Sequence, residues 1–185
     1  MLNEIKNDTK ARMAKSVEAF RHDLVKIRTG RATTSIVDHI KVNYYGSEVP
    51  LSQVASVAVS DARSLTISPW EKPMVSAVEK AILASDLGLT PNTAGMVIRL
   101  NLPPLTEERR RDLAKVVHAG GEDAKVAIRN IRRDGNHQVK ELLKEKQITE
   151  DEATRAEADI QKLTDDAIKN VDEVVRAKEQ DLMAV

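Results

Sequence analysis

Residues 128–136 read IRNIRRDGN, and this stretch decides between two folds. The dipeptide Asp134-Gly135 is common in tight turns. It nevertheless follows three arginines and two isoleucines that are spaced as on a helix. A turn here would give a bundle of ordinary short helices, whereas a continuous helix would carry the arginines along one long rod. The apolar residues on both sides of the dipeptide distinguish these folds.

Small and apolar residues recur at steps of four and three through 106–146, namely Leu113, Val117, Gly121, Ala124, Ile128, Ile131, Gly135, Val139 and Leu142. A turn at 134–135 would shift this register, but the last two residues stay in phase. We therefore predict one continuous helix, beginning after Thr106 as N-cap. Gly120, Gly121 and Gly135 each cost a helix about 1 kcal/mol relative to Ala. Close packing against neighbouring helices must therefore support the rod.

Two further long helices are predicted at the ends of the sequence. Residues 1–30 carry apolar side chains at helical spacing and are expected to end at Thr29-Gly30, where glycine can take the left-handed conformation. Residues 147–185 begin with Thr149 and Glu152 at the spacing of a capping box, and then continue with helical periodicity. These three segments predict a three-helix bundle.

The middle of the chain has a different character. Residues 31–104 contain all six prolines and short apolar runs, which predict strands at 40–46, 54–59, 64–70 and 96–102. Turns are expected at Gly46-Ser47, Ser60-Asp61 and Pro91-Asn92, and one helix at 73–86. The predicted fold class is therefore α+β, with a small, β-rich α/β domain at 31–104 inserted into a bundle of 1–30 and 105–185. The chain enters this insert at Thr29-Gly30-Arg31-Ala32 and leaves it at Leu102-Pro103-Pro104-Leu105, and two short crossings side by side predict a hinge geometry.

Composition argues against several classes of function. The chain has no cysteine, which excludes disulfides and thiolate chemistry and favours a reducing, cytoplasmic location. No stretch reaches the length of a signal peptide or a membrane span. Nucleotide-binding, hydrolase and zinc-protease motifs are absent, and the histidines are isolated, at His22, His39, His118 and His137. We therefore expect a protein that is not an enzyme and has no metal or cofactor.

The arginines of the opening stretch are the strongest functional signal. Arg129, Arg132, Arg133 and Asn136 fall at i, i+3, i+4 and i+7, so they are predicted to share one helix face turned away from the apolar seam. Guanidinium groups bind phosphate oxygens well. A second basic group, Lys26, Arg28 and Arg31, flanks Gly30, and together they predict a track for an RNA backbone. The alternative is a solvated face that pairs with 147–185, where 11 acidic residues outnumber 5 basic ones.

Four motifs carry a resemblance to a known family: KIRTGRA (26–32), DLGLTPNTAG (86–95), LPPLTEERRRDLAK (102–115) and VAIRNIRRDGN (126–136). With these motifs the chain resembles the bacterial ribosome recycling factors along its whole length. The resemblance implies an L-shaped, monomeric molecule close in outline to a transfer RNA. It also implies binding to the post-termination 70S ribosome, at large-subunit RNA near the subunit interface. Elongation factor G, by its own GTP hydrolysis, then helps to split the subunits and release mRNA and tRNA, and initiation factor 3 prevents reassociation.

The resemblance further implies that Arg28, Arg31, Arg129 and Arg132 contact ribosomal RNA. It also implies that the hinge lies at Gly30, Arg31, Pro103 and Pro104. Arg133 is added by the helical-face argument alone. The competing hypothesis is a helical scaffold or co-chaperone whose charged faces pair with protein, and pelleting with purified ribosomes distinguishes the two. An RNA-modifying enzyme is disfavoured because no catalytic group is present.

Overall fold

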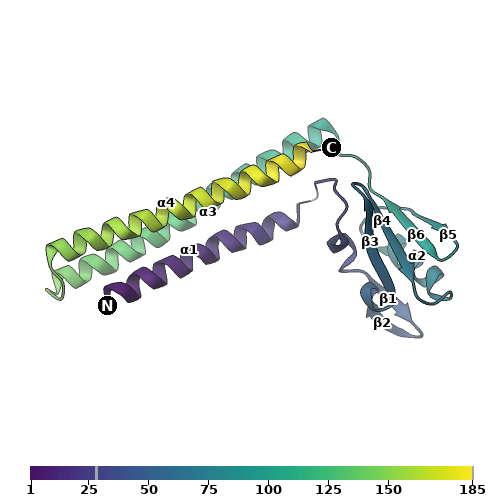
Figure 1. Ribbon diagram of the computed structural model, residues 1–185, viewed down its shortest axis with the longest axis horizontal. Coiled ribbons are helices and arrows are strands. Elements are labelled where there is room, and N and C mark those ends of the chain that lie inside the picture. The colour runs from purple at the N-terminus through teal and green to yellow at the C-terminus, as the bar shows by residue number, and fades with distance from the viewer. Residues whose placement is uncertain (28, 185) are drawn as a thin grey trace. The chain divides into compact units, whose positions relative to one another are not determined.

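The computed structural model describes residues 1–27 and 29–184, and the chain divides into two compact units. One unit combines Met1–Arg28 with Thr106–Ala184, and the other is Thr29–Leu105. The first unit consists of long helices, while the second combines antiparallel strands with a shorter helix (Figure 1). The predicted α+β class, a three-helix bundle with an inserted β-rich segment, is confirmed.

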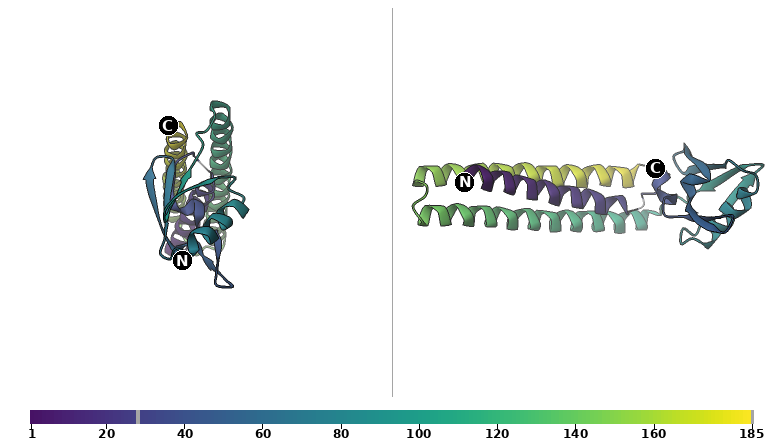
Figure 2. Two further views of the ribbon diagram at one scale, coloured as in Figure 1. Left: turned by 90° about the vertical axis from the view of Figure 1, so that its right-hand side faces the viewer. Right: turned by 90° about the horizontal axis from the view of Figure 1, so that it is seen from below.

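Three helices build the first unit: α1 (Leu2–Val25), α3 (Glu107–Lys144) and α4 (Glu150–Met183). Each helix contacts both of the others, and two views show them running alongside one another (Figures 1 and 2). Their apolar seams meet in a common core, whose buried side chains include Met13, Phe20, Ile128, Val139 and Ile160. Burial of these seams is what holds helices of this length together, since helix propensity alone contributes little.

The two later helices begin where the sequence predicts. The Thr106 hydroxyl accepts the Arg109 backbone N–H at 3.1 Å, and the Thr149 hydroxyl accepts that of Glu152 at the same distance. The Thr149 and Glu152 side chains also meet at 3.2 Å. Each cap satisfies a backbone donor that the first turn of a helix otherwise leaves unpaired.

The predicted end of the first helix is wrong. α1 ends at Val25, before the expected Thr29-Gly30. Its last turn tightens, because the N–H groups of Lys26 and Ile27 donate to carbonyls three residues earlier, at 3.3 and 3.0 Å. Gly30 does adopt a positive φ of 82°, but it does so in the crossing between the units and not as the cap of α1.

The second unit is built on a four-stranded antiparallel sheet in the order β3-β4-β6-β5, with a separate hairpin β1-β2. The strands are β1 (Lys41–Tyr44), β2 (Ser47–Pro50), β3 (Ala55–Asp61), β4 (Ser64–Pro69), β5 (Pro91–Ala94) and β6 (Val97–Asn101). Helix α2 (Met74–Ala84) and two short 3-10 helices, η1 (Thr34–Val37) and η2 (Leu51–Gln53), complete this unit.

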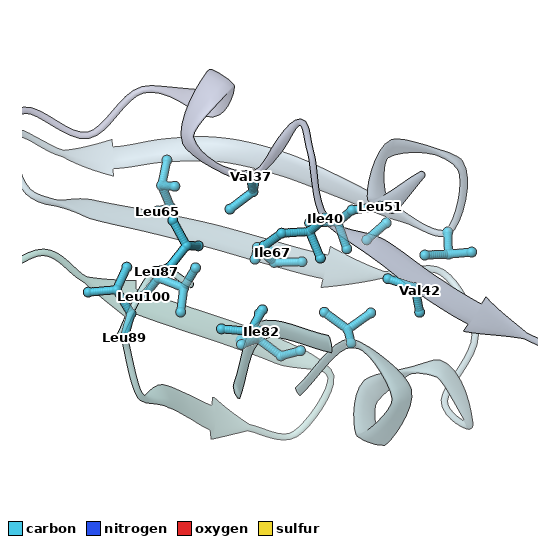
Figure 3. Packing of buried hydrophobic residues seen from close by; sticks show 14 of the residues in the cluster. Val37, Ile40, Val42, Leu51, Leu65, Ile67, Ile82, Leu87, Leu89 and Leu100 are labelled. Carbon is cyan, nitrogen blue, oxygen red and sulfur yellow. The ribbon is translucent and has the colours of Figure 1, made fainter. Parts of the chain in front are cut away.

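One face of this sheet forms a separate hydrophobic core. Leu65 and Ile67 of β4 and Leu100 of β6 are fully buried, and Ile82 of α2 packs into the same cluster (Figure 3). Alternate residues of a strand point to the same face, which explains why every second residue is apolar. The inserted unit therefore has a core of its own, as an independent domain requires.

Two strands, β2 and β5, were not predicted from the sequence. Strand β5 begins at Pro91, where a turn was expected. Proline is tolerated as the first residue of an edge strand, because it lacks only a backbone donor that would have no partner there. The predicted strand 40–46 ends at Tyr44, since Tyr45 and Gly46 both have positive φ and turn the chain into β2.

Both tyrosines of the chain are held by one carboxylate. The Tyr44 and Tyr45 hydroxyls donate to Glu71 Oε1 and Oε2 at 3.1 and 3.0 Å, and their rings meet edge to face at 4.7 Å. The hydrogen bond to Glu71, and then its negative charge, raises the pKa of each tyrosine above the ordinary value of 10.0. The three side chains therefore fix the β1-β2 turn to the segment that precedes α2.

Replacing Glu71 should change how these tyrosines titrate. In Glu71→Gln the pKa values of Tyr44 and Tyr45 should fall toward 10.0, because the negative charge that opposes phenolate formation is gone. A raised folded-state pKa stabilises the fold below the unfolded value, and this contribution is lost as the pH rises through the folded value. Phenolate absorbance measures both groups, since the chain has only two tyrosines. Identical titrations of the two proteins would contradict the contact.

Candidate nucleic-acid interface

The candidate interface lies on α3, which continues through Asp134 and Gly135 without interruption. The predicted continuous helix is confirmed. Its buried residues are those of the predicted seam, with Ile128 and Val139 fully inaccessible on the two sides of the dipeptide. The arginines of 128–136 are therefore displayed from a single helix, and their order around its axis follows from the helical repeat.

Glycines on this seam allow neighbouring helices to approach closely. A Cβ atom added to Gly135 would lie 2.9 Å from Thr9 Oγ1 and 3.3 Å from Ile160 Cδ1. At Gly121 it would lie 2.6 Å from Val175 Cγ2, which is closer than carbon atoms pack. The glycines thus lower helix propensity but let α1 and α4 lie against the backbone of α3.

The arginines do not share one fully exposed face. Arg129 and Arg133 are exposed, but Arg132 and Asn136 are only half-exposed. Arg132 Nη1 donates to Gln161 Oε1 on α4 at 3.3 Å, while Arg132 Nε and Asn136 Oδ1 are buried without a hydrogen-bond partner. The predicted single face is therefore corrected, because two of its four members lie at the α3–α4 boundary. Helical spacing correctly placed the four side chains on one side of α3. It could not show that α4 covers the part of that side where Arg132 and Asn136 lie.

The nearest carboxylate is occupied by another helix. Asp134 Oδ2 pairs with Arg12 Nη2 of α1 at 3.0 Å, so it does not neutralise the arginines beside it in sequence. Among the described residues, Arg129, Arg132 and Arg133 form no ion pair, and Arg133 Nη1 contacts only Asn130 Oδ1, at 3.3 Å. An exposed, uncompensated guanidinium pair attracts an anion, and phosphate oxygens match its geometry.

The acidic helix pairs with α3 at a different place. Lys125 Nζ lies 2.6 Å from Asp172 of α4 and 3.4 Å from Glu122, and the bond to Asp172 raises the lysine pKa. In the alternative interpretation the predicted arginines would be paired with α4. Of Arg129, Arg132 and Arg133, only Arg132 has a hydrogen bond to α4 within the described residues, and its partner there is a neutral amide. The pairing therefore leaves Arg129 and Arg133 available.

The second predicted basic group lies at the first crossing. Lys26 and Arg31 are exposed, whereas Arg28 falls outside the described residues. On the inserted unit, both crossing segments are fixed to one turn, since Ala32 N–H donates to Ala62 O at 2.8 Å and Leu102 N–H donates to Arg63 O at 2.7 Å. Backbone freedom is therefore limited on the insert side of Gly30, Arg31, Pro103 and Pro104.

Other chemistry finds little support within residues 1–27 and 29–184. This part of the chain holds no cluster of three His, Asp or Glu side chains suited to a metal ion. It also has no helix both long and apolar enough to cross a membrane. His39 meets Asp86 at 3.2 Å at an exposed position, without a third group that would form a catalytic arrangement.

Sequence reasoning missed the residues that set the positions of these arginines. Arg12 of α1 forms an ion pair with Asp134, and Gln161 of α4 accepts a hydrogen bond from Arg132. Neither contact follows from spacing within one helix, since both depend on the register between helices. The fold and the site together define a class of protein. It is a long helical bundle with an inserted α+β unit, and its exposed arginines are suited to binding an anionic partner.

The chain belongs to the ribosome recycling factor family. The model of that family, described as ribosome recycling factor, matches residues 20–183. A ribosome-recycling factor of Xanthomonas campestris pv. campestris is 66% identical over 185 residues, covering 100% of both chains. One from Xanthomonas oryzae pv. oryzae is 65% identical with the same coverage. These names indicate no catalytic activity, in agreement with the prediction that the chain is not an enzyme.

Two solved structures support the same assignment. A solution structure of the ribosome recycling factor has a TM-score of 0.75 and 41% identity, and it covers 100% of this chain and 98% of that one. The second structure has a TM-score of 0.63. It describes the T. thermophilus ribosome recycling factor and the E. coli elongation factor G bound to the E. coli post-termination complex. It is 46% identical and covers 100% of both chains.

Proposed function

We propose that this chain is a cytoplasmic ribosome recycling factor that binds the post-termination 70S ribosome. In this proposal it splits the subunits together with elongation factor G, which hydrolyses the GTP, and so releases mRNA and tRNA. Initiation factor 3 then keeps the subunits apart. The family assignment supports this role, as does the structural relative described with elongation factor G on the post-termination complex. The chain needs no phosphate-binding loop, because the partner performs the hydrolysis.

The observation that carries the proposal is the exposed arginine pair on an uninterrupted α3. Within the described part of the chain Arg129 and Arg133 have no carboxylate partner, and the nearby carboxylate of Asp134 pairs with Arg12. We assign ribosomal RNA contacts to Arg129, Arg132 and Arg133, and to Arg28 and Arg31 at the first crossing. Contacts of this kind recognise the phosphate backbone and not bases, since a helix without exposed aromatic rings has nothing on which bases could stack.

Replacing Arg132 tests the phosphate role. Arg132→Ala should weaken ribosome binding and reduce the slope of log affinity against log salt by about one unit, because one fewer counterion is released. Binding is measured by pelleting labelled protein with ribosomes across a salt series. The matched control is Arg176→Ala, which removes an exposed arginine of α4 that forms no ion pair within the described residues and should leave the slope unchanged. Equal slopes for all three proteins would exclude Arg132 from the interface.

The two crossings form the proposed hinge, at Gly30, Arg31, Pro103 and Pro104. Rotation about them would let the insert act as a lever on which elongation factor G pushes, while the bundle stays anchored on RNA. Gly30 combines a φ of 82° with a close neighbour, since an added Cβ would lie 3.3 Å from Leu105 Cγ. Any other residue at this position would therefore strain the backbone, because φ is positive, and its Cβ would crowd the Leu105 side chain.

Gly30→Ala should leave ribosome binding intact and slow subunit splitting. An alanine in the left-handed region costs about 1–2 kcal/mol, which corresponds to about a tenfold slower rate if the motion requires that geometry. Light scattering measures splitting in the presence of elongation factor G and GTP. The control is Gly95→Ala, because Gly95 also has a positive φ, 64°, but it lies in the β5–β6 turn with open space around it. Equal splitting rates in the two variants would refute a special role for the crossing.

A further inference from the structure

A second surface lies on the side of α3 that faces α1. A groove of about 450 Å³ runs between these helices, and we call it the α1–α3 groove. Phe20 and Leu24 of α1 and Ala124 of α3 line its floor and are buried, while Val116 at its side is 55% exposed. The RNA contacts proposed for α3 lie on another flank of that helix, where Arg132 meets α4.

Glycine keeps the groove open. A Cβ atom added to Gly120 would lie 3.0 Å from Phe20 Cε1. Any larger side chain at this position would therefore press against the Phe20 ring and fill part of the groove. Ala19 and Ala127 also line the groove and are small. The result is an apolar channel between two rigid helices, which suits a partner that inserts side chains into it.

Two carboxylates flank this channel. Asp23 of α1 and Asp123 of α3 both line it, and in the described part of the chain neither has a hydrogen-bond or ion-pair partner on its side chain. Among the residues that the structure describes, no lysine, arginine or histidine lines the groove. By contrast, Asp134 and Asp172 of the same bundle are paired with basic residues. The groove therefore combines an apolar floor with uncompensated negative charge at its edge.

We propose that the α1–α3 groove is a docking site for a basic, amphipathic segment of a protein on the post-termination ribosome. Apolar side chains of that segment occupy the floor, and its lysines or arginines pair with Asp23 and Asp123. Electrostatic complementarity of this kind selects the partner and speeds encounter. RNA is disfavoured as the occupant because its phosphates would meet two carboxylates without a counter-charge. This inference rests on the proposed function and adds a protein partner on the side of α3 that faces α1.

Site-specific cross-linking tests the proposal. The chain has no cysteine, so Ala19→Cys places a single photoreactive label at an exposed position that lines the groove. The labelled protein is bound to purified post-termination ribosomes with elongation factor G and irradiated. The control is Ala158→Cys, which makes the same substitution at an exposed position of α4 outside the groove. We expect a cross-link to one defined protein from position 19 and not from position 158.

Charge reversal decides whether the groove itself is responsible. Adding Asp23→Lys and Asp123→Lys to the Ala19→Cys protein should reduce this cross-link about tenfold, because like charges then face each other. A product with ribosomal RNA, a product with a second copy of this chain, no excess over position 158, or a yield insensitive to charge reversal would each overturn the inference. If the unmodified protein fails to pellet with ribosomes, the proposed function fails as well, so the two failures are distinguishable.

Discussion

Ribosome binding should fall about a hundredfold when Arg129 and Arg133 are both replaced by glutamate. Each exposed guanidinium is free to make a charge-assisted bond to a phosphate, and such a bond contributes about 1.5–3 kcal/mol. Losing two of them removes at least about 3 kcal/mol, which corresponds to about two decades of affinity. The introduced carboxylates also repel the backbone, so the salt dependence should flatten by about two units. Pelleting across a salt series measures both quantities.

The matched control for this variant reverses charges elsewhere on the bundle. Lys169 and Arg176 are exposed on α4 and form no ion pair within the described residues. Lys169→Glu with Arg176→Glu therefore changes the net charge by the same amount. A general electrostatic attraction to the ribosome predicts equal losses for both variants, whereas a defined interface predicts a large loss only on α3. Equal losses would contradict the assignment of the interface to Arg129 and Arg133.

Gly121→Ala should lower the free energy of unfolding by about 1 kcal/mol, although alanine is the better helix former. The added methyl group would lie 2.6 Å from Val175 Cγ2, and valine in a helix has little freedom to rotate away. Overpacking of this kind costs about 1–3 kcal/mol, while the gain in helix propensity is about 1 kcal/mol. Urea unfolding followed by circular dichroism measures the difference.

A double-mutant cycle identifies the cause. Val175→Ala alone should destabilise the bundle because it removes apolar contacts, yet in the Gly121→Ala protein it should restore stability by relieving the collision. Ala119→Gly, at an exposed position of the same helix, measures the propensity effect without a packing change and should cost about 1 kcal/mol. A stabilised Gly121→Ala protein would show that α4 does not approach α3 as closely as the structure indicates.

The inserted unit shows where sequence patterns are insufficient. The strands with strict alternation, such as β4 with Leu65 and Ile67, were predictable because one face is buried. β5 carries no alternation of buried residues, and its first residue is the proline that suggested a turn. What makes it a strand is its pairing with β6, for example Pro91 opposite Leu100. Edge strands of this kind depend on the partner strand more than on their own residues.

The sequence by itself determined the helices, the interruption of the bundle by a β-rich insert, and the continuity of α3 through Asp134-Gly135. Those features depend on periodicity within one segment, and the spacing of side chains along a helix or strand is fixed by local geometry. Only the tertiary structure decided that Asp134 is taken by Arg12, that Arg132 turns toward Gln161, and that Arg129 and Arg133 remain exposed. The reason is physical: which side chains meet depends on the register and facing of neighbouring helices, and these are set by close packing at residues such as Gly121 and Gly135.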